Sequence, residues 1–188
     1  MLFNHNMVLS RRIFFNGGNK RKYITGGWKT LAQTEYQAAT AEIGETIYLE
    51  GKYVARTTSS GVARTYNTAI ASTEKKIDVT NLSKICFAVT NITTTMPENA
   101  NSSVNGECVV GVADDQGLAY VANKMHNLTA AYAEITEKGT VTVDVSELTG
   151  EYFIYASATG GYYMASSMQG VQEYSINPNF EISKIWAE

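Results

Sequence analysis

The feature that most constrains the fold is a series of short segments in which apolar side chains alternate with small or polar ones. In residues 82–92, Ile85, Phe87 and Val89 recur at every second position and so share one face of an extended strand. Comparable strand signals cover residues 107–113, 131–136, 140–145, 151–156 and 180–186. A sheet with one apolar face needs a second layer to cover it, so the pattern predicts a β-sandwich.

The spacing of the strands and the residue usage agree with this fold class. Turns rich in Gly, Asn and Asp separate the strands at intervals of about 8 to 12 residues, as in sandwiches and barrels. No amphipathic helix of a dozen residues lies between them, which excludes repeated βαβ units. We therefore predict an all-β antiparallel sandwich of jelly-roll type over residues 29–188. Residues 1–28 are predicted to form an extended N-terminal arm and first hairpin that dock on a partner.

Several local pairings are also expected. Residues 46–49 and 53–56 flank Glu50-Gly51-Lys52 and predict one hairpin, and residues 131–136 and 140–145 flank Glu137-Lys138-Gly139 and predict another. Residues 31–43 have a helix-tolerant, Ala-rich composition, which suggests a short helix with poor apolar spacing.

The two cysteines, Cys86 and Cys108, lie in apolar strand segments on either side of Pro97. If those segments pair as a hairpin, the thiols face each other and a bridge can form. Two cysteines make no disulfide framework, however, and a buried free cysteine behaves as a small apolar residue. We prefer reduced thiols and keep the bridge as the alternative.

A short segment that occurs twice in the sequence suggests two equivalent corners of one sandwich. Residues 77–82 resemble residues 143–148, and each stretch places an Asp two positions before a Thr or Ser and then a Leu. The carboxylate and the hydroxyl can bond nearby backbone groups and so turn the chain between strands. The unit is too short for a solenoid repeat and fits a jelly roll.

The charge balance argues against a nucleic-acid partner. The net charge is −3 and the sequence pI is about 5.5, so no global basic field attracts a phosphate backbone. One basic cluster contains Lys20, Arg21 and Lys22, with Arg11 and Arg12 upstream. It is either a solvated flank or a docking point on an acidic partner surface.

No membrane partner is expected either. No apolar run approaches the length of a transmembrane helix, and the N-terminal residues lack the apolar stretch of a signal peptide. We expect synthesis in a cytoplasm without a cleaved leader.

The search for catalytic residues returns no defined constellation. His5 and His126 are isolated, and no metal-binding pair, nucleophile elbow or phosphate-binding loop occurs. Asp114 and Asp115 could contribute to a calcium site, but a plain turn is the simpler interpretation. We predict a protein that is not an enzyme, with no catalytic residue, no metal and no cofactor.

Aromatic surface is the remaining candidate for recognition. Residues 159–164 look like a loop that carries Tyr162 and Tyr163, and neighbours on an extended chain alternate sides, so at least one should be exposed. Exposed tyrosine is a favoured recognition element, and a sugar face could stack on it. The alternative is one tyrosine in the core and the other idle. Tyr120 is a further candidate.

Two motifs carry a resemblance to a known group of proteins. Phe14-Phe15-Asn16-Gly17-Gly18 is followed by Thr25-Gly26-Gly27-Trp28, and the end of the chain has an Asp144-to-Tyr152 run and a final strand at 180–186. This arrangement resembles small virion proteins of phages that infect Gram-positive bacteria, in which a lectin-like β-sandwich often follows the Thr-Gly-Gly-Trp motif. We expect Trp28 to cap the core, because the glycines let the backbone pass close under the indole.

The resemblance implies an accessory structural protein of a virion, such as a capsid decoration, a head fibre or a tail or baseplate appendage. Its partners would be other virion proteins, and the chain would form a homo-oligomer. The docking residues would come from the arm, and they are Phe3, Arg11, Arg12, Ile13, Phe14, Lys20, Arg21 and Lys22. The alternative function is a carbohydrate-binding module, or an adhesin that recognises host surface glycan through exposed aromatics. An enzyme such as a glycan hydrolase is a third hypothesis without a constellation to support it.

Overall fold

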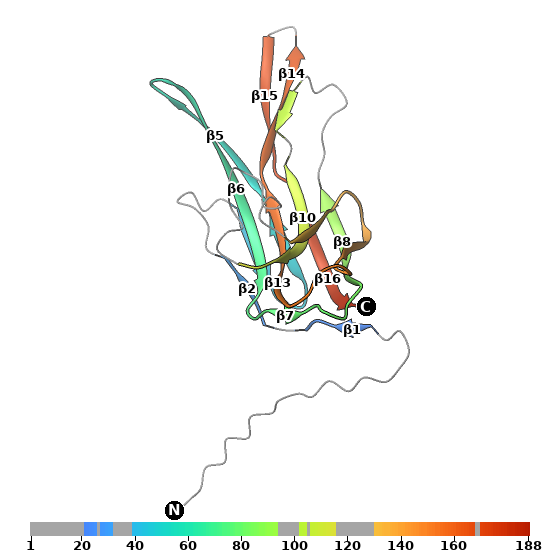
Figure 1. The fold of residues 1–188 in the computed structure, drawn as a ribbon. Coiled ribbons are helices and arrows are strands. Elements are labelled where there is room, and N and C mark those ends of the chain that lie inside the picture. Colours follow the sequence, from blue (N-terminus) through green and yellow to red (C-terminus); the bar gives the residue numbers. More distant parts are fainter. Residues whose placement is uncertain are drawn as a thin grey trace, which may run out of the picture.

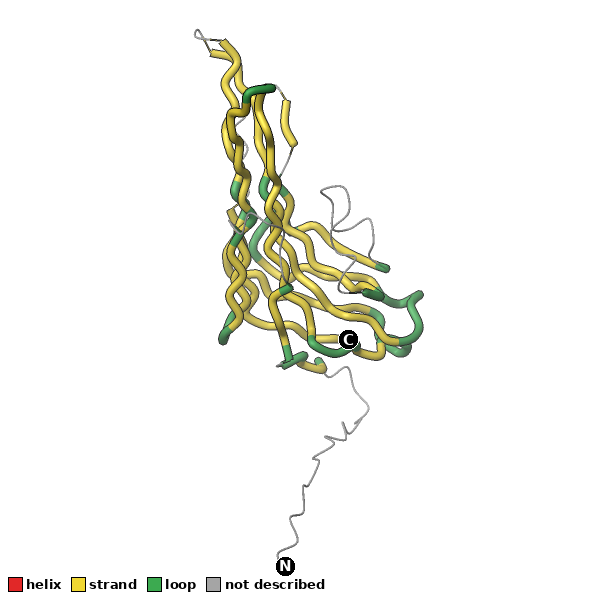
Figure 2. Tube along the Cα trace, turned by 90° about the vertical axis from the view of Figure 1, so that its left-hand side faces the viewer, coloured by secondary structure: helices red, strands yellow, loops and turns green. Residues whose placement is uncertain are grey.

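The computed structural model describes residues 21–25, 27–31, 39–93, 102–104, 106–115, 130–167 and 170–188. Every regular element in these ranges is a β-strand, and every strand pair is antiparallel (Figure 2). The predicted all-β antiparallel class is therefore confirmed. In the described part of the chain, no helix is long and apolar enough to cross a membrane.

The strands form three sheets. The first sheet contains β1 (Lys22–Tyr23), β3 (Thr40–Ile43), β4 (Ile47–Glu50), β8 (Lys84–Thr93), β12 (Gly139–Asp144) and β16 (Asn179–Ala187). The second contains β2 (Trp28–Thr30), β5 (Lys52–Thr58), β6 (Gly61–Thr73), β7 (Ile77–Asp78), β10 (Glu107–Ala113), β11 (Ala131–Glu134) and β13 (Glu151–Thr159). The third contains β9 (Ser102–Val104), β14 (Gly161–Ser167) and β15 (Gly170–Ile176).

The first two sheets have the strand order of a jelly roll. The first runs β12-β8-β16-β4 and the second runs β11-β10-β13-β6, and both continue at their ends into the short strands β3 and β2. Along the chain, β4, β8, β12 and β16 alternate with strands of the second sheet. Eight strands that cross between two sheets in this order make the two Greek keys of a jelly roll, as the sequence predicts.

The core lies between these two sheets. Phe87 and Phe180 from the first sheet and Ile154 and Val110 from the second are fully buried in one apolar cluster. Ile85, Phe87 and Val89 all face this core, as their alternation predicts, while Trp28 packs against its edge as a half-buried cap. Apolar burial of this kind is the main favourable term in folding.

Both predicted hairpins are wrong, for one reason. β4 and β5 flank Gly51 but join different sheets, β4 pairing with β16 and β5 with β6. β11 and β12 likewise flank a turn and pair with β10 and β8. A jelly roll moves the chain from one sheet to the other at such turns, and a local turn signal does not distinguish a hairpin from a sheet-to-sheet crossing.

The predicted helix and the hairpin around Pro97 also need correction. Thr40–Ile43 is strand β3, whereas residues 32–38 lie outside the described residues. β8 and β10 belong to different sheets, so Cys86 and Cys108 do not face each other as cross-strand neighbours. Both thiols are free and buried, and burial raises the pKa of Cys108 to about 12.

The two similar segments, residues 77–82 and 143–148, form equivalent corners, as predicted. The Asp78 carboxylate accepts hydrogen bonds from the Thr80 amide at 3.0 Å and the Thr80 hydroxyl at 2.5 Å. The Asp144 carboxylate accepts the same two bonds from Ser146, at 2.9 and 2.7 Å. The Thr80 hydroxyl also accepts a bond from the Gly150 amide, which ties the two corners together.

The corners predict a pH-dependent stability. Hydrogen bonds from Thr80 and Ser146 hold the pKa of Asp78 and of Asp144 below the ordinary 3.8 of this side chain. Groups with a depressed pKa stabilise the folded state above their unfolded pKa, and that contribution is lost as the pH falls through the folded pKa. Urea unfolding of the wild type should therefore show a fall in the free energy of unfolding below about pH 4. The double variant D78N/D144N should show a flatter curve in that range, and an unchanged slope would contradict the role given to the corners.

Candidate functional site

Two projections leave the same end of the sandwich. β5 and the first half of β6 form one, and the third sheet forms the other, at the end opposite β1 and the C-terminus (Figure 1). The burial of β6 marks the boundary between the projection and the sandwich, because the strand is exposed at its start and buried from Asn67 to Thr73. We call β5 with residues 61–66 the β5–β6 hairpin, and β14 with β15 the β14–β15 hairpin.

Both hairpins begin at one tightly packed junction. A β-carbon on Gly51 would lie 2.5 Å from the Gly160 backbone nitrogen, and a β-carbon on Gly160 would overlap the backbone of Lys52 and Tyr53. Only glycine at both positions lets the two backbone segments pass this closely. The Asn67 amide donates to the Lys52 carbonyl at 3.0 Å and so fixes the base of the β5–β6 hairpin.

A cluster of three tyrosines lies above the junction, between the two hairpins. Tyr53 and Tyr66 are cross-strand neighbours in the β5–β6 hairpin, and Tyr162 comes from β14. The centroids of the Tyr53 and Tyr162 rings are 5.2 Å apart, and those of Tyr53 and Tyr66 are 5.5 Å apart. Tilted rings at this separation attract each other beyond their area burial. Tyr53 is buried, so this cluster joins the hairpins rather than presenting open ring faces.

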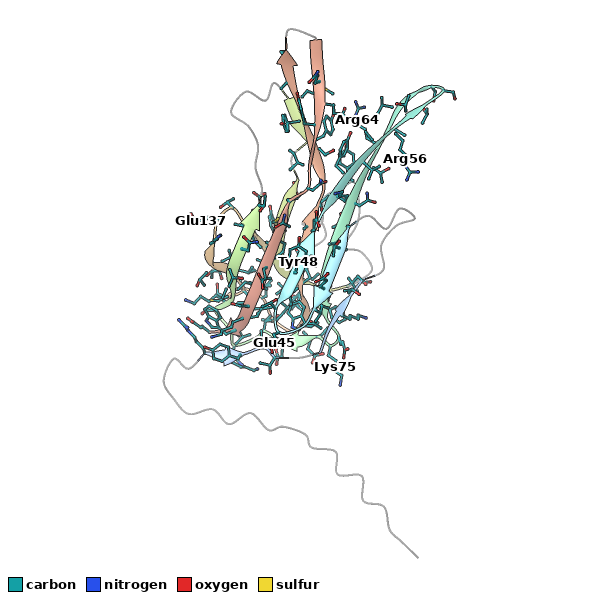
Figure 3. The ribbon with its side chains drawn as sticks, turned by 180° about the vertical axis from the view of Figure 1, so that it is seen from behind. Glu45, Tyr48, Arg56, Arg64, Lys75 and Glu137 are labelled. Carbon is teal, nitrogen blue, oxygen red and sulfur yellow. The ribbon has the colours of Figure 1, made fainter. Side chains whose placement is uncertain are left out.

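A charged bridge, formed by Glu173, Arg64 and the Tyr53 hydroxyl, lies on the side of the tyrosine cluster away from the sandwich. Glu173 on β15 accepts hydrogen bonds from Arg64 at 2.9 and 2.6 Å and from the Tyr53 hydroxyl at 2.5 Å. The Arg64 guanidinium also lies over the Tyr162 ring, 5.2 Å from its centroid, and Figure 3 shows this side chain between the two hairpins. Burial, followed by the hydrogen bond to Glu173, raises the pKa of Tyr53. Burial acts to raise the pKa of Glu173 as well, but the bonds from Arg64 and Tyr53 outweigh it and hold that pKa below its usual value.

The inner faces of the hairpins open beyond this bridge. Alternation along regular strands puts Val62 on the same face as Arg64 and Tyr66, and Val171 on the same face as Glu173. Both valines are largely exposed. The aromatic cluster and the charged bridge therefore close the base of the space between the hairpins and leave their outer ends apart.

The opposite face of the third sheet carries a second aromatic group. Tyr163 and Tyr174 are cross-strand partners whose rings stack almost parallel, with centroids 5.0 Å apart at 12°. The Tyr174 hydroxyl donates to the Gln172 side-chain carbonyl at 2.6 Å, which holds the ring in place. Tyr174 keeps 40% of its surface exposed. We call these three residues the tyrosine shelf.

The structure brings together part of what the sequence suggested. Tyr162 and Tyr163 lie on strand β14 and not on a loop, and they point to opposite faces, as alternation predicts. The sequence analysis does not single out Tyr53, Tyr66 or Tyr174, because their aromatic neighbours come from strand pairing that no local pattern shows. The available signal was the Arg64-x-Tyr66 spacing in β6, which places a cation and an aromatic ring on one face of a strand. Tyr120 lies outside the described residues.

The arm is described only from Arg21 onward, so Phe3, Arg11, Arg12, Ile13, Phe14 and Lys20 lie outside the described residues. Arg21 pairs with Glu188 at 3.5 Å and lies 4.7 Å from the Trp186 ring centroid. Lys22 belongs to β1, which pairs with the end of β16. Residues 22–23 and 28–30 join opposite sheets. The turn of the expected first hairpin, at residues 16–18, lies outside the described residues.

Among the described residues, no group of three or more His, Cys, Asp and Glu side chains is placed to hold a metal ion. His126 lies outside the described residues, and Asp114 and Asp115 are exposed at the end of β10.

Comparison with known proteins gives distant structural similarity. No protein-family model and no curated protein matches the chain. A low-affinity xylan-binding module, CBM86, from Roseburia intestinalis is similar at 12% identity and a TM-score of 0.40, over 87% of this chain and 96% of that one. The K1 cleaved adhesin domain of Lys-gingipain from Porphyromonas gingivalis W83 is similar at 13% identity and a TM-score of 0.40, over 88% and 92% of the two chains.

The charged bridge predicts how the hairpins are held. Replacing Glu173 with Ala removes the acceptor for both Arg64 and Tyr53, so the β14–β15 hairpin loses its polar contact with the β5–β6 hairpin. Hydrogen–deuterium exchange should then become about fivefold faster in β14, β15 and the β5–β6 hairpin, and stay unchanged in the sandwich. Glu134→Ala, at an exposed carboxylate on β11, is the matched control. Equal effects of the two variants would show that the bridge does not couple the hairpins.

Proposed function

We propose that this chain is a non-enzymatic binding module that recognises glycan through the tyrosine shelf. The observation that carries the proposal is the stacked, partly exposed pair of Tyr163 and Tyr174 on a projecting sheet. A pyranose ring has an apolar face of C–H groups and a polar rim of hydroxyls. A tyrosine matches both, because its ring covers the face and its hydroxyl lies at the level of the rim.

The shelf is held in its binding geometry before a ligand arrives. Tyr163 and Tyr174 lie in a regular register on paired strands, and Gln172 fixes the Tyr174 hydroxyl. Binding to such a surface orders few side chains, so little conformational entropy is lost on association. Placement on strands rather than on a loop also favours precise contacts.

The tyrosines between the hairpins are less suited to stacking. Arg64 covers one side of the Tyr162 ring, and Tyr53 is buried beneath it. A sugar would have to displace a guanidinium that makes two bonds to Glu173. We therefore assign recognition to the shelf and mechanical support to the inner cluster.

The non-enzymatic part of the proposal rests on the ionisation of Glu173, which is adjacent to Tyr174 in the chain. Glu173 follows Gln172 on β15, but alternation points it to the other face, where Arg64 and Tyr53 hold it ionised. A general acid for glycoside cleavage needs a raised pKa, and a second carboxylate must flank the scissile bond. Glu173 has a lowered pKa instead.

The decisive experiment compares two exposed tyrosines. Tyr174→Ala should lower the affinity for a polysaccharide that the wild type binds about tenfold, because loss of a stacking ring costs on the order of 1.4 kcal/mol. Tyr132→Ala, at a tyrosine of similar exposure on β11, should leave affinity unchanged. A glycan array would find the ligand, and titration calorimetry would compare the variants. Retention of full affinity by Tyr174→Ala would remove the shelf from the site.

The second candidate places this module on a virion, as the motifs in the sequence suggest. One arrangement favours it: β1 and the C-terminus meet at the end of the sandwich opposite the hairpins (Figure 1). A chain tethered by its N-terminal arm would then direct its hairpins outward. This arrangement supports display from a larger assembly.

Assembly through the arm predicts a homo-oligomer that depends on it. Native mass spectrometry of the full chain should give a multiple of 20.6 kDa, and a variant that lacks residues 1–20 should give the monomer mass. The truncated variant keeps every described strand, so its thermal unfolding serves as the folding control. A full chain that is monomeric at micromolar concentration would argue for a free module.

A further inference from the structure

A cleft opens at the end of the sandwich opposite the hairpins. It has a volume of about 700 Å³ and lies between β1 and the connection from β6 to β7. β1 is held by its pairing with β16, and the Ile24 amide donates to the Ile185 carbonyl at 2.8 Å. On the other side, β7 pairs with β13. The two walls therefore belong to different sheets, and both are fixed by backbone hydrogen bonds.

The rim of the cleft is basic. Lys22 on β1 and Lys75 and Lys76 on the β6–β7 connection line it, against one carboxylate, Glu74. No ion pair joins any of these three lysines to a carboxylate of the described residues. Figure 3 shows Lys75 at this end of the molecule, far from Arg64. A local excess of positive charge on a chain of net charge −3 marks a place where a partner can supply the opposite sign.

The interior of the cleft is apolar. Ile24 and Ile77 line it from the two walls, Ala187 lines it from the end of β16, and Tyr23 stands at its side with 51% of its surface exposed. An apolar interior under a charged rim is a common form of protein interface, with an exposed aromatic residue as a candidate anchor. A phosphate backbone would satisfy the lysines but leave this apolar surface uncovered.

We propose that this cleft is a docking site for an extended, acidic peptide segment of a partner protein. In an extended segment, alternate side chains point to opposite sides, so one row can fill the apolar interior while the other brings carboxylates to the lysines. The proposal does not depend on glycan binding, because the tyrosine shelf lies at the other end of the molecule.

The test uses three fluorescein-labelled peptides with alternating residues: Glu and Leu, Glu and Ser, and Lys and Leu. Fluorescence anisotropy with the full chain should show the Glu–Leu peptide binding more tightly than the other two. The variant K75E/K76E should weaken that binding at least about tenfold, since it reverses two rim charges. Lys138→Glu, at an exposed lysine in the turn before β12, is the matched control and should have no effect.

The other outcomes would overturn the proposal. Equal binding of the Glu–Ser peptide would show surface electrostatics without use of the apolar interior. A fluorescein-labelled single-stranded DNA is measured beside the peptides, and tighter binding of this DNA than of the Glu–Leu peptide would assign the lysines to a phosphate polymer. No binding of the Glu–Leu peptide, or binding that K75E/K76E leaves intact, would show that the cleft is not a docking site. Both lysines are exposed, but the Lys76 ammonium lies 5.5 Å from the centroid of the Phe153 ring. The thermal unfolding of K75E/K76E is therefore compared with that of the wild type, and Lys75→Glu alone, which keeps this contact, should weaken binding in the same direction.

Discussion

The close approach of two backbones at Gly51 and Gly160 is the constraint on which the projecting end of the molecule depends. At this point the segment after β4 leaves the first sheet and enters β5, and the segment after β13 leaves the second sheet and enters β14. A side chain at either position would push the two backbone segments apart. The tyrosine cluster above the junction can then form only because the hairpins start in contact. Their geometry is thus set by main-chain packing first and by side-chain chemistry second.

The charged and aromatic side chains of the hairpins divide between two faces because strands alternate. Tyr162 and Glu173 point to the β5–β6 hairpin, where Arg64 and Tyr53 satisfy them. Tyr163 and Tyr174 point away from it, where their rings stack on each other and the Tyr174 hydroxyl donates to Gln172. The same two strands therefore carry a supporting face and a face that is available to a ligand. This division explains why neighbouring tyrosines in the sequence receive different roles.

Prediction from the sequence succeeded where a local pattern has one structural outcome. The alternation of Ile85, Phe87 and Val89 gave the core face of β8, and the repeated Asp-x-Thr/Ser segments gave two equivalent corners. Prediction failed where one pattern has two outcomes. A glycine turn such as Gly51 serves a hairpin or a sheet crossing equally well, and only long-range pairing decides between them. The shelf was found in part, since Tyr163 was visible as an aromatic candidate while its partner Tyr174 depends on the register of β14 with β15.

The length of β6 connects the two ends of the molecule. Its first residues, from Gly61, belong to the β5–β6 hairpin, and its last seven are buried in the sandwich. Its final residue, Thr73, lines the cleft between β1 and the β6–β7 connection. At about 3.3 Å per residue, a strand of this length spans about 40 Å. A ligand on the projecting sheet and a peptide in the cleft would therefore bind without steric interference. Because the last seven residues of β6 are buried and β6 pairs with β13 in the second sheet, the separation is fixed, and a partner tethered at one end directs the end with the tyrosine shelf outward.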